Sequence, residues 1–120
     1  MAAMVVLYGI KTCSTVKKAM KWLEEQDIAF QYHDVRKDGV TSALLTSWCA
    51  LLGWEKLLNR SSLTFRRLDN ADKEGLDESK AIALMMAHPT LIRRPVTVMG
   101  ERVVVGFKPE LYEGFFNRTA

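Results

Sequence analysis

Cysteine and histidine are both scarce in this sequence. Its 120 residues contain two cysteines, Cys13 and Cys49, and two histidines, His33 and His88. Two cysteines do not make a disulfide framework, so a reducing cytoplasm is the default location. The histidines are scattered along the chain, and the sequence therefore predicts no metal site.

Long apolar runs and a strong bias of charge are also missing. No window approaches 18 uninterrupted apolar residues, and the first residues lack the basic and apolar regions of a signal peptide. We therefore expect no membrane span, and we expect Met1–Ala3 to be an extension ahead of a start at Met4. The net charge is +3, from 17 basic and 14 acidic residues that are interspersed. This mild excess does not indicate a nucleic-acid partner.

The remaining composition is that of an ordinary globular protein. Hydrophobic residues make up 48% of the chain and charged residues 26%, which are typical values. A length of 120 residues predicts one domain, spanning residues 1–120, with its own core.

The prediction of the fold starts from the segment around Cys13. An apolar, β-branched run ends at Tyr8, is interrupted by Gly9, and is typical of a buried strand. From Val16 onward, apolar residues follow helical spacing up to about residue 26. Cys13 therefore lies where a helix begins. Its neighbours have side chains suited to capping a helix: Thr12, Ser14 and Thr15.

This position favours a reactive thiolate. The first turn of a helix has unpaired N–H groups and a partial positive charge, and Lys11, Lys17 and Lys18 add cations nearby. Such surroundings lower a cysteine pKa from ~8.5 into the range ~3.5–7.5. The same N–H groups could hold an oxyanion or a glutathione carboxylate. The alternative is a buried structural cysteine, although the polar neighbours of Cys13 do not suggest apolar burial.

The next residues complete a βαβ unit and begin a helical region. Residues 28–35 suit a second strand, which favours a parallel pair with a right-handed crossover. After a turn at 36–39, Thr41 or Ser42 caps a helix that runs to about Leu52 and ends at Gly53. Cys49 lies beside the apolar face of this helix. We expect it to pack in the core, with a resolving or regulatory thiol as the alternative.

The second half of the chain predicts further helices and then a hairpin. Residues 54–58 suit a short helical turn, 59–62 a loop, and 65–75 a charged connection whose arginines form either a solvated face or an anion site. Asp77 or Ser79 starts a helix that Pro89 stops. Residues 93–99 and 102–105 form a hairpin. A last helix begins around Pro109.

The order βαβ, helices, ββα predicts an α/β (α+β) fold. Its strands form a four-stranded mixed sheet flanked by helices, which is the thioredoxin-like arrangement, with an inserted helical subdomain at about 41–90. In that fold the first strand delivers a cysteine to the helix start, and a proline precedes the hairpin. Arg94-Pro95 lies at the position directly before the hairpin, and a cis peptide bond is plausible there. An ordinary trans proline opening an edge strand is the alternative.

Four motifs then resemble one family along nearly the whole chain, from Met4 to about Phe116. They are Leu7-Tyr8-Gly9-Ile10-Lys11-Thr12-Cys13, Leu57-Leu58-Asn59-Arg60, Ile92-Arg93-Arg94-Pro95-Val96 and Val105-Gly106-Phe107. They resemble the arsenate reductase (ArsC)/Spx family, and within it the YffB-like branch. The resemblance implies a thioredoxin-like fold with an inserted helical subdomain. In the enzymes it implies one nucleophilic cysteine that is regenerated through glutathione and glutaredoxin.

The resemblance also assigns roles to individual residues. Cys13 matches the catalytic cysteine, and Arg94 matches an oxyanion-binding arginine directly before the family's Pro95. The other two arginines of arsenate reductases fall at Asn59, with Arg60 adjacent, and near Lys108. The lead Tyr8-Gly9-Ile10 replaces a His-Asn-Pro type sequence. A lysine lacks the planar fork that suits tetrahedral oxyanions, so these differences argue against arsenate as the substrate.

The predicted function is a glutathione-dependent thiol reductase with one catalytic residue, Cys13. The predicted site for substrate or glutathione comprises Lys11, Thr12, Ser14, Thr15, Arg60, Arg94, Pro95 and Lys108. We expect no bound cofactor, glutathione as co-substrate, glutaredoxin as a further partner, a small-molecule or thiol substrate, and a cytoplasmic monomer. The alternatives are a non-catalytic Spx-like protein-binding module, or an arsenate reductase proper. The Spx branch commonly has a Cys-x-x-Cys switch, whereas this chain has Val16 at the fourth position.

Overall fold

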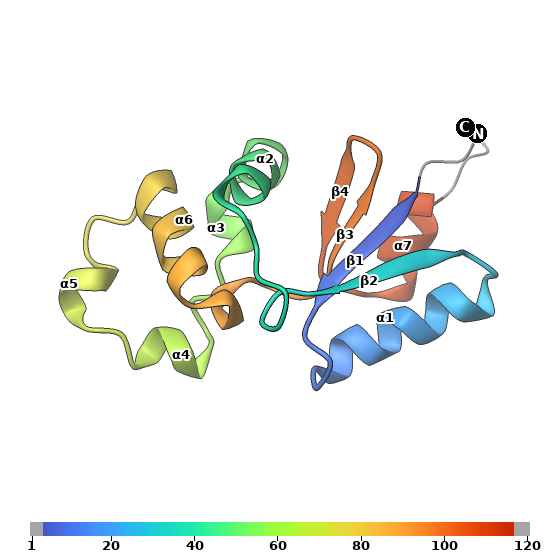
Figure 1. Cartoon of the computed structure of the whole chain (residues 1–120), viewed down its shortest axis with the longest axis horizontal. Coiled ribbons are helices and arrows are strands. Elements are labelled where there is room, and N and C mark those ends of the chain that lie inside the picture. Colours follow the sequence, from blue (N-terminus) through green and yellow to red (C-terminus); the bar gives the residue numbers. More distant parts are fainter. Residues whose placement is uncertain (1–3, 117–120) are drawn as a thin grey trace. The chain divides into compact units, whose positions relative to one another are not determined.

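A computed structural model of the chain describes residues 4–116 (Figure 1). The expectation for Met1–Ala3 lies outside these residues. The contacts between residues divide the chain into two compact units. Among the described residues, unit 1 combines 4–34 with 94–116, and unit 2 is the continuous segment 35–93.

Unit 1 contains the sheet. Its elements are β1 (Val5–Gly9), α1 (Ser14–Glu25), β2 (Phe30–Asp34), β3 (Val96–Met99), β4 (Arg102–Val105) and α7 (Pro109–Phe116). The four strands lie in the order β2-β1-β3-β4. β1 pairs in parallel with β2 and antiparallel with β3, and β3 pairs antiparallel with β4. The predicted four-stranded mixed sheet is confirmed.

One face of this sheet is covered by both helices of unit 1. Val5 and Leu7 alternate with partly exposed residues along β1, and they pack on the buried stripe Val16, Ala19 and Leu23 of α1. Aromatic residues of α7 complete this core: Tyr112, Phe115 and Phe116. The apolar stripe of α1, spaced at helical intervals, therefore holds the helix and its N-terminus against β1.

A buried hydrogen bond joins α7 to the sheet. The hydroxyl groups of Thr97 and Tyr112 are 2.5 Å apart, and both side chains have no exposed surface. Burial raises the pKa of Tyr112 to about 12, although the Thr97 hydroxyl acts in the opposite direction.

Unit 2 is helical. Its elements are α2 (Ser42–Leu52), α3 (Trp54–Leu57), α4 (Leu63–Arg66), α5 (Asn70–Lys73), α6 (Glu78–Ala87) and the 3₁₀ helix η1 (Pro89–Leu91). Its core is buried and apolar: Leu45, Trp48, Cys49, Leu57, Leu58, Ala81, Leu84, Met85, Leu91 and Ile92. The expected caps are present, since the side chain of Thr41 accepts the N–H of Leu44 and that of Asp77 accepts the N–H of Lys80.

A short antiparallel contact in unit 2 joins the residue after α3 to the residue after η1. Leu58 and Ile92 form an isolated β-bridge. The N–H of Asn59 donates to the carbonyl of Leu91 at 2.7 Å, and the N–H of Arg93 donates to the carbonyl of Leu57 at 2.8 Å. The backbone at Arg93 therefore pairs within unit 2 and is not part of β3.

The structure differs from the sequence prediction at element boundaries and in the 59–75 region. β2 begins at Phe30 and β3 at Val96, later than the predicted 28 and 93. Within the predicted loop and connection, α4 and α5 each form a four-residue helix with no buried residue. Such short helices have no apolar stripe for a sequence pattern to reveal. Across residues 4–116, no helix is long and apolar enough to span a bilayer.

Candidate active site around Cys13

Cys13 is the N-cap residue of α1, at the end of a four-residue loop after β1. Its backbone is extended, its N–H donates to the carbonyl of Ile10 at 3.0 Å, and its carbonyl accepts the N–H of Lys17 at 3.1 Å. These two bonds fix the cysteine between a tight turn and the first turn of the helix. The thiol is half-buried, so it is accessible to a reagent.

Gly9 sets how closely β1 approaches α1. A Cβ atom at Gly9 would lie 2.7 and 2.9 Å from the two methyl carbons of Val16, closer than unbonded carbon atoms pack. Val16 is completely buried against the sheet. A glycine at the end of β1 therefore lets the first turn of α1 lie directly against the strand, and this places Cys13 at the strand's carboxyl end.

The surroundings of Cys13 favour the thiolate. Partial burial by itself raises the pKa of Cys13. This effect is outweighed by the N–H of Val16, the hydrogen bond and charge of the Arg94 guanidinium, and the N–H of Thr15, so the pKa is lowered from its ordinary value. Cys13 makes no conventional side-chain capping hydrogen bond, but the N–H groups of the helix's first turn still stabilise its negative charge.

The direction of this shift was predicted, and its causes were predicted in part. The helix N–H groups act as the sequence analysis expected. The flanking lysines do not: Lys11, Lys17 and Lys18 are exposed, and they are not among the groups that lower the pKa. Arg94, which lies 81 positions further along the chain, supplies the positive charge instead. Solvent between exposed ammonium groups and the sulfur screens their interaction.

Arg94 reaches the sulfur from the segment that enters β3. The Arg94–Pro95 peptide bond is cis, as predicted. The carbonyl of Pro95 accepts the N–H of Gly106 at 2.8 Å, which anchors the segment to the end of β4. Arg94 is half-buried, and its Nε atom is shielded from solvent. Of the predicted site, unit 1 therefore brings together Cys13, Thr15 and Arg94 through contacts with the sulfur, and Pro95 adjoins them in sequence.

The other predicted site residues are not among the groups that act on the Cys13 sulfur. Thr12 and Ser14 flank Cys13 and are exposed. Lys108 is exposed, and its carbonyl accepts the N–H of Tyr112 at the start of α7. Arg60 belongs to unit 2, where its guanidinium lies 5.6 Å from the centre of the Trp54 ring. Roles for these residues in binding glutathione remain predictions.

Asn59 has a structural task at the position where the family resemblance expects an arginine. Its side-chain oxygen accepts the N–H of Ser61 at 3.1 Å, and its carbonyl accepts the hydroxyl of Ser62 at 3.0 Å. This is the turn-forming use of asparagine. Ser62 in turn caps α4 by accepting the N–H of Phe65 at 3.2 Å.

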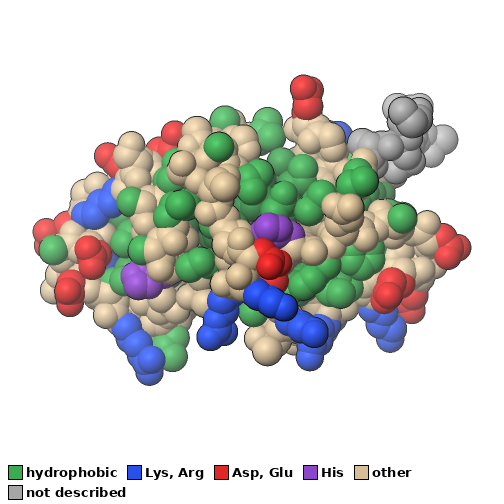
Figure 2. Space-filling view, in the orientation of Figure 1, with side chains coloured by type: hydrophobic (Ala, Val, Ile, Leu, Met, Phe, Trp, Pro, Cys, Tyr) green, Lys and Arg blue, Asp and Glu red, His purple; other side chains and the backbone are tan. Residues whose placement is uncertain are grey.

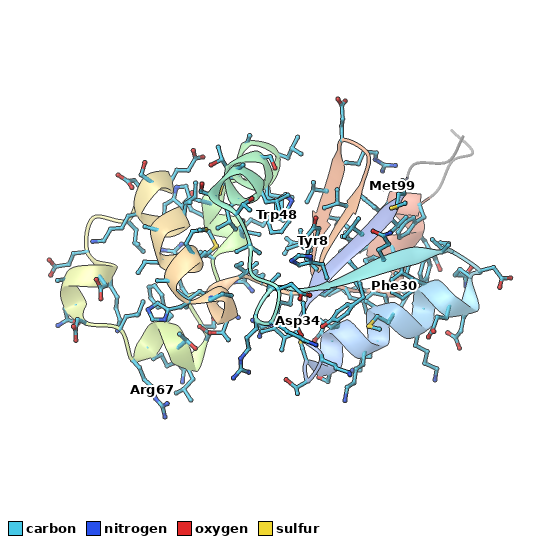
Figure 3. The ribbon with its side chains drawn as sticks, in the orientation of Figure 1. Tyr8, Phe30, Asp34, Trp48, Arg67 and Met99 are labelled. Atoms are coloured by element: carbon cyan, nitrogen blue, oxygen red, sulfur yellow. The ribbon has the colours of Figure 1, made fainter. Side chains whose placement is uncertain are left out.

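An aromatic pair at the sheet's carboxyl end was not predicted. Tyr8 is paired in register with His33 of β2 and Val96 of β3, and the Tyr8 and His33 ring centroids lie 4.9 Å apart. Burial raises the pKa of the Tyr8 hydroxyl. Figure 3 shows Tyr8 and Asp34 near the ends of their strands. The pairing of Tyr8 with His33 follows from the cross-strand register, which the sequence alone does not fix.

Cys49 is buried in unit 2, at 4% exposure, as the core prediction required. Burial raises the pKa of its thiol, and the charge of Glu78 adds to this effect. The two thiols of the chain thus have opposite shifts. Among residues 4–116, no three side chains of metal-ligating type are grouped together. In the view of Figure 2, most of the visible basic side chains lie along the lower edge, and the acidic side chains lie mainly elsewhere.

A family model described as the ArsC family matches residues 8–115. The chain belongs to the ArsC family. The solved structure of the YFFB protein is 50% identical, with a TM-score of 0.90, and the match covers 92% of this chain and 97% of that one. A protein of Haemophilus influenzae described as uncharacterized is 40% identical over 94% of this chain and 99% of its own length.

Regulators and enzymes both occur among the similar proteins. The global transcriptional regulator Spx 2 of Bacillus anthracis is 31% identical over 97% of this chain and 89% of its own length. The structure of an arsenate reductase from Vibrio cholerae is 26% identical, with a TM-score of 0.81 and coverage of 92% and 96%. A glutaredoxin of Archaeoglobus fulgidus, at 16% identity and a TM-score of 0.50 over 93% of this chain and 84% of its own, shares only the fold. The thioredoxin-like fold is thereby confirmed.

Proposed function

We propose that this ArsC-family protein is a glutathione-dependent thiol reductase that uses Cys13 as its single nucleophile. The observation that carries the proposal is the pair Cys13 and Arg94. A half-buried thiol at a helix N-terminus is held toward its thiolate form by two backbone N–H groups and by a guanidinium from a distant segment. A low-pKa, accessible thiolate is the nucleophile that thiol–disulfide chemistry requires.

The first step transfers glutathione from substrate to enzyme. The Cys13 thiolate attacks the glutathione sulfur of a mixed disulfide, so that a new disulfide forms between Cys13 and glutathione. The bond between that sulfur and the substrate sulfur breaks, and the substrate leaves as a thiolate that takes a proton from solvent. The guanidinium of Arg94 and the N–H groups of Thr15 and Val16 stabilise negative charge on the sulfur before attack.

The second step restores the enzyme. The thiolate of a second glutathione, or of a glutaredoxin, attacks the glutathione sulfur of the adduct. Cys13 then leaves as a thiolate, which its low pKa favours, and the attacking thiol becomes part of a disulfide. Over both steps the mixed disulfide of the substrate is exchanged for a disulfide between glutathione and the attacking thiol, so one thiol is consumed and one thiol, that of the substrate, is released. An external thiol is required because Val16 occupies the Cys-x-x-Cys position and Cys49 is buried in unit 2.

Turnover of a peptide whose cysteine carries glutathione tests this proposal. Release of the peptide thiol is followed in excess reduced glutathione for the wild type, Cys13→Ser and Cys49→Ala. We expect the wild type and Cys49→Ala to release the thiol at similar rates, and Cys13→Ser to match the uncatalysed rate. The proposal fails if Cys13→Ser retains activity, or if the wild type does not exceed the uncatalysed rate.

Arsenate is a poorer candidate for the substrate. Where a family arginine is expected, Asn59 instead closes a turn with Ser61. Each missing charge-assisted contact to an oxyanion costs on the order of 1.5–3 kcal/mol. Efficient arsenate reduction with glutathione and glutaredoxin would show that Arg60 and Lys108 substitute for the missing arginines.

A second candidate is a protein-binding module like the Spx regulators, which the 31% identity to Spx 2 of Bacillus anthracis favours. In that case Cys13 would be dispensable for function, and the turnover assay would give no Cys13-dependent rate. The lack of a second cysteine at Val16 removes the intramolecular switch that this branch commonly has.

A further inference from the structure

Three lysines on the exposed face of α1 have no role in the thiol chemistry described above. Lys17, Lys18 and Lys21 are exposed, and they follow Ser14 at helical spacings of i+3, i+4 and i+7. They therefore form one lysine stripe, which runs from the end of the helix where Cys13 lies. The three lysines are not among the groups that lower the pKa of Cys13, so stabilisation of the thiolate does not explain them.

The charges of α1 are arranged against the helix dipole. The first turn has no acidic residue and the last turn has no basic residue. Lys17 and Lys18 occupy the N-terminal half, where a helix favours anions, and Glu24 and Glu25 end the helix, where it favours cations. Lys17 and Lys21 also form a like-charge pair at i and i+4. This arrangement costs helix stability, as is expected where charged side chains serve an interaction instead.

The end of the sheet that carries Cys13 has an excess of positive charge within unit 1. No acidic residue occurs from position 10 to position 23. Two acidic residues lie where strands finish at this end: Asp34 at the end of β2, whose carboxylate accepts the Tyr32 hydroxyl at 3.3 Å, and Glu110 in the first turn of α7. Arg94 and Lys108 match these two residues in number. The lysine stripe therefore remains as a net positive charge.

Distance along the helix decides which charges of α1 act near the thiol. A rise of ~1.5 Å per residue places Lys17 and Lys18 ~6–8 Å from Cys13 along the axis, and Glu24 and Glu25 ~16–18 Å from it. The Debye length is ~10 Å at an ionic strength of 0.1 M. A partner whose disulfide reaches Cys13 is thus within range of the two lysines and beyond that of the two glutamates. In Figure 1, α1 forms the lower side of unit 1, and most basic side chains visible in Figure 2 lie along that edge.

We propose that the lysine stripe selects acidic substrates, so that the glutathione mixed disulfide attacked by Cys13 lies in a peptide segment with carboxylates beside its cysteine. This inference rests on the proposed function and names its substrate class. The lysines act on the approach of the substrate, because a surface of one charge raises the local concentration of an oppositely charged partner. They are selectivity residues and take no part in the exchange of disulfides.

Two matched peptides test this inference. Each has one cysteine carrying glutathione, with a glutamate on both sides in one peptide and a glutamine on both sides in the other. Release of the peptide thiol gives kcat/KM at ionic strengths of about 0.1 M and about 1 M. A pair of unit charges ~10 Å apart changes binding about twofold in water without salt, and about 1.3-fold when screened by a Debye length of ~10 Å. Two lysines and two carboxylates make four such pairs. They should contribute a preference of about threefold at 0.1 M, which should vanish at 1 M, where the Debye length is ~3 Å.

Two variants locate the source of the preference. Lys17→Gln/Lys18→Gln should lower it about threefold at 0.1 M and leave the rate for the uncharged peptide unchanged. Adding Glu24→Gln and Glu25→Gln gives a second variant with the net charge of the wild type. The preference should stay low in this second variant, because the two glutamates lie far from the thiol. All four side chains are exposed, so both variants should fold, and the rate for the uncharged peptide checks this.

The outcomes separate this inference from the proposed function. If neither peptide is turned over, the proposed function fails and this inference fails with it. If the wild type turns over both peptides at equal rates, only this inference fails. A preference that persists in Lys17→Gln/Lys18→Gln, or that the added glutamate replacements restore, would also overturn it, since net charge would then be the cause. Binding of a short DNA duplex that the two lysine replacements abolish would assign the lysine stripe to a nucleic acid instead.

Discussion

Replacing Arg94 by glutamine should raise the pKa of Cys13 and change how its reactivity depends on pH. The Arg94 guanidinium acts on the sulfur both by a hydrogen bond and by its charge. Glutamine keeps a polar side chain of moderate length but removes the charge. The N–H groups of Thr15 and Val16 remain, so the pKa should move toward the ordinary value of a cysteine without exceeding it by much.

The size of this effect is limited by solvent. Cys13 and Arg94 are both half-buried, so the lost interaction should be worth on the order of 1 kcal/mol, as for partly screened pairs. At any pH below the pKa values of both thiols, that corresponds to about fivefold less thiolate. The remaining thiolate is more nucleophilic because its basicity is higher, with a Brønsted coefficient of ~0.4–0.5. The net loss of rate in that pH range is therefore only about twofold, and it should reverse at a pH where both thiols are fully ionised.

Alkylation by iodoacetamide as a function of pH measures this effect, in a Cys49→Ala background that leaves one thiol. The curves of the parent and Arg94→Gln should cross, with the variant slower at pH values below both pKa values and faster in strong alkali. Arg93→Gln is the matched control, because Arg93 is the adjacent arginine and is exposed. Curves of Arg94→Gln and Arg93→Gln that coincide would refute the assigned role of Arg94.

Three further predictions concern the rest of the chain. Cys49 should be labelled by thiol reagents only after unfolding, because it is buried and its pKa is raised; rapid labelling in the native protein would contradict its place in the core. Tyr112 has a folded-state pKa of about 12, against ~10 when unfolded. Its contribution to stability is therefore complete below pH ~10, and about 2–3 kcal/mol should be lost as the pH rises to about 12. Tyr112→Phe should lack this alkaline loss in urea unfolding, and should lose roughly 1–3 kcal/mol at neutral pH by leaving the Thr97 hydroxyl unpaired. Gly9→Ala should cost about 1–3 kcal/mol, since its methyl group would overlap Val16. The same substitution should cost less in a Val16→Ala background if the overlap is the cause.

The fold was predictable where burial leaves a periodic pattern. The run before Gly9 and the stripe from Val16 to Leu23 identify β1 and α1 because both are packed on one side. The four-residue helices α4 and α5 have no buried face, so nothing in their sequence distinguishes them from a loop. The start of β3 was misplaced because Arg93 looks like the first residue of a strand, although its N–H pairs with Leu57 in unit 2.

The candidate site was predictable only in part, because one half of it is local and the other is not. Cys13 and the N–H groups beside it follow from a single stretch of sequence. Arg94 could be named from the family resemblance, but its contact with the sulfur depends on the sheet. Lys11 is close to Cys13 in the sequence, but its side chain is exposed and is not among the groups that lower the pKa of Cys13. The contact of Gly9 with Val16 and the pairing of Tyr8 with His33 depend on tertiary structure that no local pattern encodes.

The mass of the intact protein after treatment with oxidised glutathione tests the central claim most directly. Cys13 has no cysteine at position 16 to pair with, and disulfide geometry requires Cα atoms within ~7 Å. We predict one glutathione adduct per chain, located on Cys13, absent in Cys13→Ser and formed more slowly in Arg94→Ala. An internal disulfide between Cys13 and Cys49, seen as a loss of two hydrogens without added glutathione, would contradict this account.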